Sequence, residues 1–122
     1  MMQYQWLEAY LLAKPGARKV YKEDWQATLY LLGEKIFALC GSDKYGKPII
    51  SFKLEPAHGD LLRQQFADLV PGYHLNRLHW NSLYLEGATP DEVVRGMMDE
   101  SYRLILESFS RKKRQEVLAG SK

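Results

Sequence analysis

Two closely spaced histidines are the first candidates for chemistry in this sequence. His74 and His79 lie five residues apart in a polar, aromatic stretch, and His58 lies further upstream. A pair of imidazoles at this spacing could bind a metal ion, but a typical zinc site supplies three or four protein ligands. No Asp or Glu lies between the two histidines and no third ligand is evident, so we expect no metal. The predicted role of these rings is structural, with ring nitrogens bonded to backbone carbonyls.

Nucleophilic catalysis is the next possibility, and the sequence offers little for it. Cys40 is the single cysteine, so the chain has neither an internal disulfide nor a cysteine-based zinc site. It lies in an apolar run without a charged neighbour that would lower its pKa, which is typical of a buried, inert thiol. Ser101 occupies the core side of an expected helix, and no nucleophile elbow, phosphate-binding loop or dinucleotide fingerprint occurs. We therefore predict a protein that is not an enzyme and holds no cofactor.

A third group of residues has the chemistry to contact nucleic acid. Asn76, Arg77, His79 and Trp80 lie in one short stretch, and Lys53 alternates with apolar neighbours in an expected strand. Their amide, cationic and aromatic groups could bond to a base or stack on it. The alternative is structural, with Lys53 on a solvent-facing strand and Asn76 capping a turn. For Trp80 the structural interpretation is favoured, because a large aromatic side chain mostly fills a core.

Charge is distributed unevenly along the chain, although its total of +2 is too small to predict nucleic-acid binding. Residues 14–53 hold eight Lys and Arg against four Asp and Glu, residues 54–110 hold four against nine, and residues 111–122 hold five against one. Solvated faces are the usual explanation of such runs. The alternative is an electrostatic footprint on one side of the molecule.

Hydrophobic periodicity predicts one α+β domain that spans residues 1–122. The expected order is roughly α-β-β-β-β-α-β-α, with a curved antiparallel sheet of about five strands packed on helices. Helices are predicted over 3–13, 56–69 and 89–109, strands over 17–22, 25–32, 36–40, 48–54 and 82–86, and a short fraying helix in the basic tail 111–122.

Spacing that matches each element's period also predicts the core. Within residues 25–32, Trp25, Ala27, Leu29 and Leu31 share one face of a strand. The expected core consists of Trp6, Leu29, Leu31, Ile36, Ala38, Ile50, Phe52, Leu62, Phe66, Leu83, Leu85, Met98 and Ile105.

The clearest local signal is Thr89-Pro90-Asp91-Glu92, which has the pattern of a capping box. Thr89 is the expected N-cap, Pro90 suits the first helical position, and Glu92 could reach back to the cap. We therefore predict that a helix begins here and that the Thr89 side chain bonds the amides of residues 91 and 92.

A set of short motifs occurs in a specific order over nearly the whole chain, from about residue 4 to residue 115. They are Lys14-Pro15-Gly16-Ala17, Ser51-Phe52-Lys53-Leu54, Pro71-Gly72-Tyr73-His74-Leu75-Asn76, His79-Trp80-Asn81, Leu85-Glu86-Gly87 and Ser101-Tyr102. In this order and spacing they resemble the MmcQ/YjbR family, and the histidine-containing segment with the turn after it is the most specific part. Glu86 stands where that family more often has Asp, which is a conservative difference.

The resemblance implies both a fold and a function. The fold would be similar to frataxin-like (CyaY-like) and secretion-chaperone-like architectures, and the function would be DNA binding by two hairpin loops that act as a double wing. That function rests on shape, and a fold alone does not determine function. An iron site of the frataxin kind is not expected, since hard cations need clustered oxygen ligands and the first helix offers only Glu8.

Two functions remain open. In the first, a DNA-binding module, Lys35, Lys44 and Lys47 on the hairpin loops meet phosphates, with Lys53 and Arg77 behind them. In the second, an adaptor domain without catalysis holds a partner peptide on its sheet face or an edge strand. Convergence of Lys44, Lys47 and Arg77 on one concave face would favour DNA, and their scatter around the rim would favour the adaptor.

The sequence carries no sign of export or membrane insertion. Its N-terminus lacks a basic region followed by an apolar core, and no apolar run approaches the roughly 20 residues that cross a bilayer. We therefore expect no signal peptide, no contact with a membrane, and a cytoplasmic protein that is a monomer or a weak homodimer.

Overall fold

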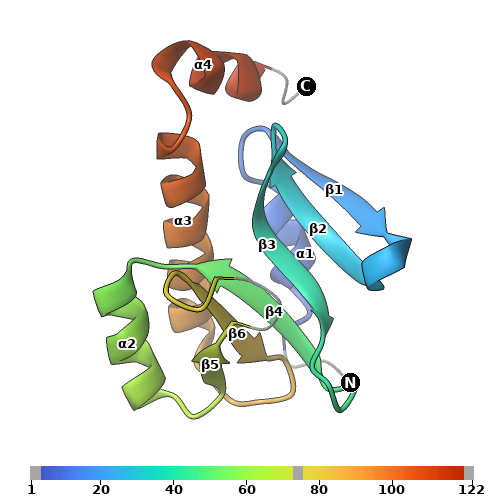
Figure 1. The fold of residues 1–122 in the computed structure, drawn as a ribbon, viewed down its shortest axis with the longest axis vertical. Coiled ribbons are helices and arrows are strands. Elements are labelled where there is room, and N and C mark those ends of the chain that lie inside the picture. Colours follow the sequence, from blue (N-terminus) through green and yellow to red (C-terminus); the bar gives the residue numbers. More distant parts are fainter. Residues whose placement is uncertain (1–3, 73–75, 120–122) are drawn as a thin grey trace.

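An antiparallel sheet of six strands, in the order β1-β2-β3-β4-β6-β5, forms the centre of the molecule (Figure 1). The structure is a computed structural model that describes residues 4–72 and 76–119. The strands are β1 (Ala17–Lys22), β2 (Ala27–Leu32), β3 (Lys35–Ser42), β4 (Pro48–Lys53), β5 (Leu69–Pro71) and β6 (Trp80–Tyr84). The helices are α1 (Leu7–Leu12), α2 (Pro56–Gln65), α3 (Asp91–Glu107) and α4 (Arg111–Ala119), with a 3₁₀ turn, η1, over Glu23–Trp25.

The element order confirms the α+β class and the antiparallel sheet. The sheet has one strand more than the number expected, because Leu69–Pro71 pairs with β6 as the short edge strand β5. The helix predicted to reach residue 69 ends at Gln65, since Phe66 already has an extended backbone. Trp80 and Asn81, expected in an irregular segment, are the first residues of β6.

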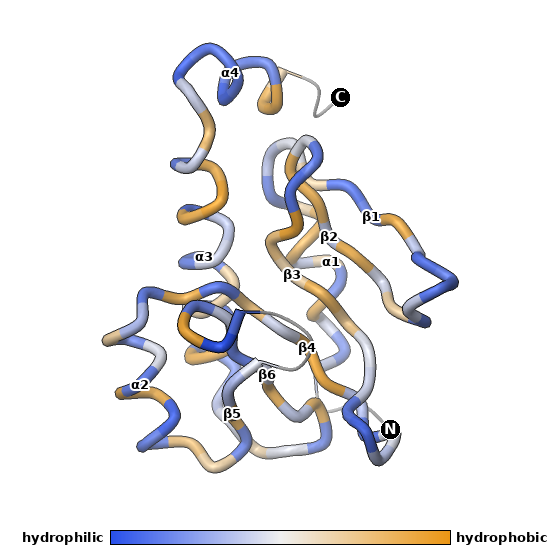
Figure 2. Tube along the Cα trace, viewed as in Figure 1, coloured by the Kyte–Doolittle hydropathy of each residue, from blue (hydrophilic) through white to orange (hydrophobic). Residues whose placement is uncertain are grey.

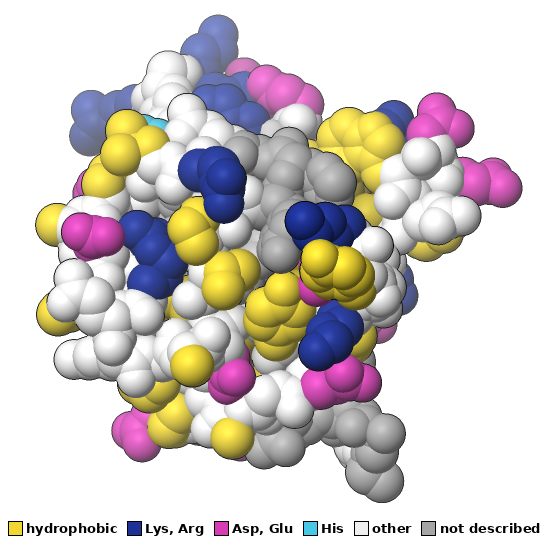
Figure 3. Space-filling view, turned by 60° about the horizontal axis from the view of Figure 1, so that its bottom comes forward, with side chains coloured by type: hydrophobic (Ala, Val, Ile, Leu, Met, Phe, Trp, Pro, Cys, Tyr) yellow, Lys and Arg dark blue, Asp and Glu magenta, His cyan; other side chains and the backbone are white. Residues whose placement is uncertain are grey.

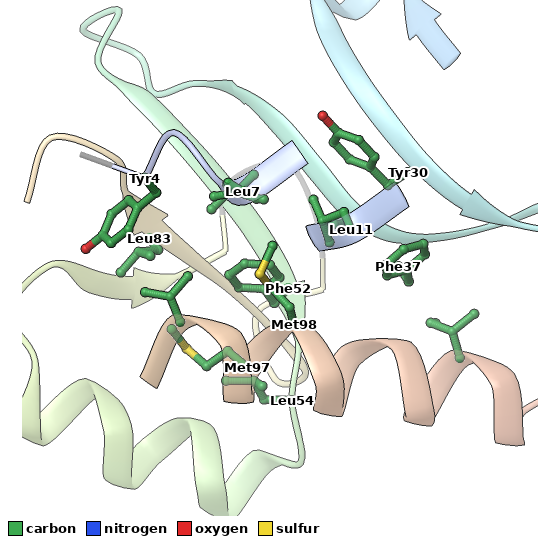
Figure 4. Packing of buried hydrophobic residues seen from close by; sticks show 14 of the residues in the cluster. Tyr4, Leu7, Leu11, Tyr30, Phe37, Phe52, Leu54, Leu83, Met97 and Met98 are labelled. Carbon is green, nitrogen blue, oxygen red and sulfur yellow. The ribbon is translucent and has the colours of Figure 1, made fainter. Parts of the chain in front are cut away.

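The helices α1 and α3 cover one face of the sheet, and the main core lies between them and the strands (Figure 1). Figure 4 shows Leu7 and Leu11 of α1 and Met97 and Met98 of α3 around Phe52 of β4. Figure 2 shows the hydrophobic residues concentrated in the strands and interspersed with polar ones along α3. In the described part of the chain, no helix is long and apolar enough to cross a membrane.

The opposite face of the sheet, called the open face below, carries a second and smaller apolar cluster. It consists of Ala27, Leu29, Leu31 and Leu39, with Val20 and Ile36 packed at its margin. Leu29 and Leu31 are buried, as predicted, but their assignment to the main core is wrong. Side chains alternate along a strand, so Tyr30 and Leu32 point to the helices instead. The strand β2 is therefore apolar on both faces.

A β-bulge in β3 explains a second difference from the expected core. Tyr30 pairs with Ala38 and Leu31 pairs with Ile36, so Phe37 has no paired residue in β2. Two consecutive side chains, Phe37 and Ala38, therefore join the main core, while Ile36 stays at the margin of the open-face cluster. The expected core includes Ile36 and omits Phe37 because it assumes strict alternation, which a bulge interrupts.

Three large aromatic side chains lie further out than expected. Trp6 and Phe66 are only partly buried against the main core. Trp25 is 54% exposed, because η1 reverses the chain before β2 begins at Ala27. The buried members of the expected core are Leu29, Leu31, Ala38, Ile50, Phe52, Leu62, Leu83, Leu85, Met98 and Ile105.

A buried serine joins α3 to the two central strands. The ladder between β3 and β4 ends at the pair formed by Ala38 and Phe52. Beyond this pair, the Ser101 hydroxyl donates to the Phe37 carbonyl (2.6 Å) and accepts a hydrogen bond from the Lys53 amide (2.9 Å). Ser101 is fully buried, so its hydroxyl satisfies two backbone groups at the point where the ladder stops.

The start of α3 differs from the predicted capping box. The N-cap is Pro90, and its side chain makes no capping hydrogen bond. The Thr89 hydroxyl donates instead to the Asp68 carboxylate (3.0 Å), which also accepts the Ala88 amide (2.8 Å). Thr89 is buried, and its carbonyl accepts the Tyr4 hydroxyl (2.6 Å). The helix begins two residues after the predicted start, and the capping role of Thr89 is wrong because a tertiary contact uses its hydroxyl.

The basic tail forms the helix α4, which is docked on the rest of the molecule. Val117 belongs to the main core and lies against Gly16 and Gly33. A Cβ at Gly33 would come within 3.1 Å of the Val117 side chain, so the bare glycine permits this close approach. Lys113 and Glu34 form an ion pair (3.8 Å) beside it.

The two adjacent leucines of α2 give a test of the core. Leu62 is 8% exposed and Leu61 is 51% exposed. We expect Leu62→Ala to lower the free energy of unfolding by about 2–5 kcal/mol, because it removes buried apolar atoms and leaves a cavity. Leu61→Ala, the matched control, should change it by less than about 0.5 kcal/mol. Urea denaturation measures both, and equal midpoints for the two variants would contradict this placement.

The two hydrogen bonds of the Ser101 hydroxyl give a second test of the fold. Ser101→Ala should destabilise the fold by about 1–3 kcal/mol, because two buried backbone groups lose their partner. Native-state hydrogen exchange should show faster exchange of the Lys53 amide in this variant. An unchanged exchange rate for that amide would show that the hydroxyl is not its acceptor.

Candidate nucleic-acid interface

The predicted site residues first meet where β4 ends and β6 begins. Lys53 and Trp80 are opposite each other in the ladder, and the Leu54 amide donates to the His79 carbonyl (2.8 Å) just beyond them. Phe52 and Leu54 point to the main core, so alternation places Lys53 and Trp80 on the open face. Both side chains are half-buried, as is that of His79. Trp80, for which a structural role is favoured, is thus half-buried and belongs to neither apolar cluster.

Residues 76–79 form a tight turn that leads into this pair. The Asn76 carbonyl accepts the Trp80 amide (2.8 Å), and the Asn76 side-chain oxygen accepts the Leu78 amide (2.8 Å). Asn76 thus caps the turn, which is one of its two predicted roles. Asn76, Arg77 and Leu78 are exposed, so the turn places the Arg77 guanidinium in solvent.

The other predicted cations lie on the β3–β4 hairpin, residues 43–47, which Asp43 organises. The Asp43 Oδ1 accepts the amides of Tyr45 and Lys47, each at 2.9 Å. The Asp43 Oδ2 accepts the Tyr84 hydroxyl (2.9 Å), which ties the hairpin to β6. The Asp43 amide also donates to the Lys47 carbonyl (2.9 Å). This buried carboxylate therefore fixes the conformation of the loop.

The same contacts change the ionisation of Asp43. Its partial burial opposes the charged form, but hydrogen bonds from the two amides and the tyrosine hydroxyl outweigh that effect. The pKa of Asp43 is consequently lower than its ordinary value of 3.8. The carboxylate stays charged at neutral pH, and the loop holds Lys44 and Lys47 in exposed positions.

Lys35 is not close to the other predicted cations. It is the first residue of β3, and the hairpin lies beyond the other end of this eight-residue strand, about 25 Å away at 3.3 Å per residue. Lys35 is opposite Leu32, which points to the helices. Its Nζ donates to the Ser108 Oγ (2.8 Å) and lies 4.6 Å from the centre of the Phe109 ring. The structure therefore places Lys35 on the helix side.

The four remaining cations lie in two groups at opposite ends of β4. Lys44 and Lys47 precede its first residue, whereas Lys53 is its last residue and Arg77 lies in the adjoining turn. Six residues of strand separate the groups by about 17–20 Å at 3.4 Å per residue. The cations thus neither meet at one point nor scatter around the rim. We call this set, Lys44, Lys47, Lys53 and Arg77, the cationic strip.

The cations of the strip form no ion pair with a described carboxylate, unlike Lys14 and Lys19. Lys14 forms an ion pair with Asp99, and Lys19 forms one with Glu8. Among residues 4–72 and 76–119, no carboxylate forms an ion pair with a member of the strip. A phosphate can therefore bind these side chains without breaking an existing ion pair.

The other candidates for chemistry have structural surroundings. No group of three or more metal-binding side chains occurs in the described part of the chain, and His74 lies outside the described residues. The His58 ring bonds to the Glu100 carboxylate of α3. Burial, with a smaller effect from Glu8, raises the pKa of the Cys40 thiol to about 12. Cys40 is consequently a protonated thiol at neutral pH.

Sequence reasoning missed two features of this surface. The role of Asp43 in holding the hairpin could have been found from the sequence. Asp is favoured at the first position of a type I turn and Gly at the fourth, and Asp43 and Gly46 have this spacing. The exposure of Trp25 had no comparable signal, since its spacing from Ala27 matches the period of a strand.

Comparison with known proteins identifies relatives along most of the chain. The family model described as YjbR matches residues 12–104. The chain is 36% identical over 106 residues to the Escherichia coli K12 "Uncharacterized protein YjbR", covering 87% of this chain and 89% of that protein. It is 29% identical over 92 residues to the Escherichia coli O157:H7 "Uncharacterized protein YbdF", covering 75% of each chain.

Solved structures share the fold. The crystal structure of the Deinococcus radiodurans protein DR2400, with a DUF419 domain, has a TM-score of 0.81 and 26% identity, and the match covers 96% of this chain and 88% of that one. A crystal structure from Pseudomonas syringae has a TM-score of 0.70 and covers 85% of this chain and 98% of that one. At 20% identity, the second comparison is a likeness of fold alone.

The lowered pKa of Asp43 gives a test by pH titration. The contribution of the carboxylate to the hairpin is present above its ordinary pKa and is lost as the pH falls through the lowered folded-state value. In NMR spectra, we expect the amide signals of Tyr45 and Lys47 to titrate together with a midpoint below 3.8. Asp43→Asn, the control, keeps an acceptor oxygen but cannot ionise, so this titration should disappear. A wild-type midpoint at or above 3.8 would contradict the assigned contacts.

Proposed function

The chain belongs to the YjbR family, and we propose that it binds DNA weakly and with little sequence preference through the cationic strip. One observation carries the proposal: four cations lie at the two ends of β4, and none forms an ion pair with a described carboxylate. The resemblance to a family whose hairpins have been likened to a double wing supports the same surface.

Several acidic side chains lie on the helix side of the sheet. Of the nine Asp and Glu in residues 54–110, five lie on α3, which covers the face opposite the open face. Asp99 is paired with Lys14, and Glu100 accepts the Glu55 amide. Both carboxylates therefore already have partners on the helix side of the sheet.

The composition of the strip predicts weak, salt-sensitive binding. Contacts with at most about four phosphates give a slope of up to about −3.6 for log affinity against log salt on duplex DNA. Contacts with phosphates position a protein but do not read sequence. We therefore expect dissociation constants of about 10⁻⁴–10⁻⁶ M at physiological salt, similar for unrelated sequences.

The proposed activity is binding without catalysis. The Cys40 thiol is protonated at neutral pH, because burial raises its pKa to about 12. The Ser101 hydroxyl is fully buried and is occupied by two backbone groups. These contacts support a structural role for both side chains.

A partner peptide is the second candidate ligand. In the described part of the chain, β1 has no strand beyond it, so its outer backbone groups are available to an added strand. Arg18, Lys19 and Lys22 lie along β1, which favours an acidic peptide. This adaptor function takes the place of DNA binding if the following test fails.

Charge reversal on the β3–β4 hairpin tests the proposal. We expect the double variant Lys44→Glu, Lys47→Glu to bind DNA more weakly than wild type, because both phosphate contacts become repulsive. Fluorescence anisotropy with two unrelated duplexes over a salt series measures the effect. The loss should be the same for both sequences, and the salt slope should become shallower by about 1.8.

A second double variant distinguishes the effect of the hairpin position from the effect of the change in net charge. Arg111→Glu, Lys112→Glu makes the same change in net charge on exposed residues of α4. In Figure 1, α4 and the β3–β4 hairpin lie at opposite ends of the long axis. This control should bind as wild type does. Equal losses for the two double variants, or no binding by wild type to duplex and single-stranded DNA at low salt, would show that the DNA proposal is wrong.

A further inference from the structure

Two chain reversals in the sheet each carry an exposed aromatic ring. Trp25, in η1 between β1 and β2, is 54% exposed, and Tyr45, in the β3–β4 hairpin, is 75% exposed. A single exposed ring is common on protein surfaces, so the exposure of Trp25 and Tyr45 gains meaning only together with their neighbours and their positions.

Each ring is accompanied by a lysine. The Lys22 Nζ lies 5.1 Å from the centre of the Trp25 ring, and the Lys44 Nζ lies 5.3 Å from the centre of the Tyr45 ring. Both distances are within the range of a cation–π interaction. The same arrangement, an aromatic face with a cation beside it, therefore occurs on both turns.

The backbone fixes both turns. Gln26 has a left-handed conformation (φ 50°), and its amide donates to the Glu23 carbonyl (3.0 Å), which closes η1. Gly46 also has a positive φ (83°), and its amide donates to the Asp43 carbonyl (3.0 Å). The two rings are thus presented by ordered turns, which lowers the entropy lost when a ligand binds.

The two turns leave the same end of the sheet. Thr28 of β2 pairs with Cys40 of β3, so the start of β2 lies beside the end of β3. In Figure 1 the reversal between β1 and β2 lies at the right edge, and the β3–β4 hairpin lies near the bottom, beside the N-terminus. Two strand spacings separate the centres of the two hairpins, or about 10 Å within the sheet. Figure 3 shows hydrophobic side chains with Lys and Arg side chains beside them at separate places on this side of the molecule.

We propose that Trp25 and Tyr45 are stacking platforms for two unpaired bases of a single-stranded nucleic acid, with Lys22 and Lys44 at its phosphates. This inference rests on the proposed DNA binding and names its substrate class. Exposed aromatic rings beside cations are the means by which proteins bind single strands without sequence preference, because every base has a face that can stack. A few unstacked nucleotides bridge the distance between the two rings.

The surroundings of the rings favour a single strand over a protein or a duplex. Aromatic hot spots in protein interfaces lie at the centre of patches depleted of charged residues. Here Trp25 directly follows Glu23 and Asp24, and each ring has a lysine over it. In a duplex the bases stack on one another, so their faces are not available to the two rings, whereas the bases of a single strand are.

Alanine variants of the two rings test the inference. The probes are a labelled single-stranded oligonucleotide of mixed sequence and the duplex formed with its complement, both at low salt. Wild type should bind the single strand more tightly. Trp25→Ala and Tyr45→Ala should each weaken binding to the single strand about fivefold or more, with little change for the duplex. Tyr21→Ala removes another exposed aromatic, on β1 and 60% exposed, and should have no effect.

A conservative variant identifies stacking as the cause. Trp25→Phe keeps a ring, so it should bind the single strand nearly as wild type does. Binding should quench the tryptophan fluorescence of wild type more than that of Trp25→Phe, because Trp25 is more exposed than Trp6 and Trp80. Quenching that is unchanged in this variant would show that the bases do not reach Trp25.

The outcomes separate this inference from the proposed function. If DNA binds but the alanine variants bind the single strand as tightly as wild type, the stacking platforms are wrong while binding through the cationic strip stands. The same conclusion follows if wild type prefers the duplex. If wild type binds neither form at low salt, both proposals are wrong.

Discussion

The hydrogen bonds of the Ser101 hydroxyl to β3 and β4 are the contacts on which the rest of the sheet depends. The ladder between β3 and β4 ends at Ala38 and Phe52, so the Phe37 carbonyl and the Lys53 amide would be buried there without a partner. One hydroxyl from α3 satisfies both of them. It thereby fixes the position of α3 against the sheet and the end of β4, from which Lys53 projects.

The two faces of the sheet therefore differ in what covers them. One face is buried under α1 and α3, which carry many of the acidic side chains. The open face has a smaller apolar cluster, and Lys53 of the cationic strip points to this face. Because antiparallel hairpins return to the same end of a sheet, residues far apart in the chain, such as Trp25 and Tyr45, lie on neighbouring turns. A binding surface of this kind is therefore built from several loops on a rigid sheet.

Most of the secondary structure could be predicted because its signals are local. Pro15-Gly16 ends the first helix, Pro90 begins the long helix near its observed start, and alternation marks β2 and β4. The order of short motifs was enough to identify the family over most of the chain. Part of the site was equally accessible: the turn that includes Asn76 and Arg77 and the hairpin lysines lie where the sequence places them.

The sequence by itself therefore determined the class, the family and most element positions, since each depends on residues that are neighbours in the chain. Only the tertiary structure decided which partner each polar group took. Ser101 bonds to a carbonyl 64 residues away, and Lys35 bonds to a serine 73 residues away, which removes it from the cationic strip. The Thr89 hydroxyl likewise bonds to Asp68 rather than to its own helix. No local pattern encodes these contacts, because their energies arise only when distant segments are buried together.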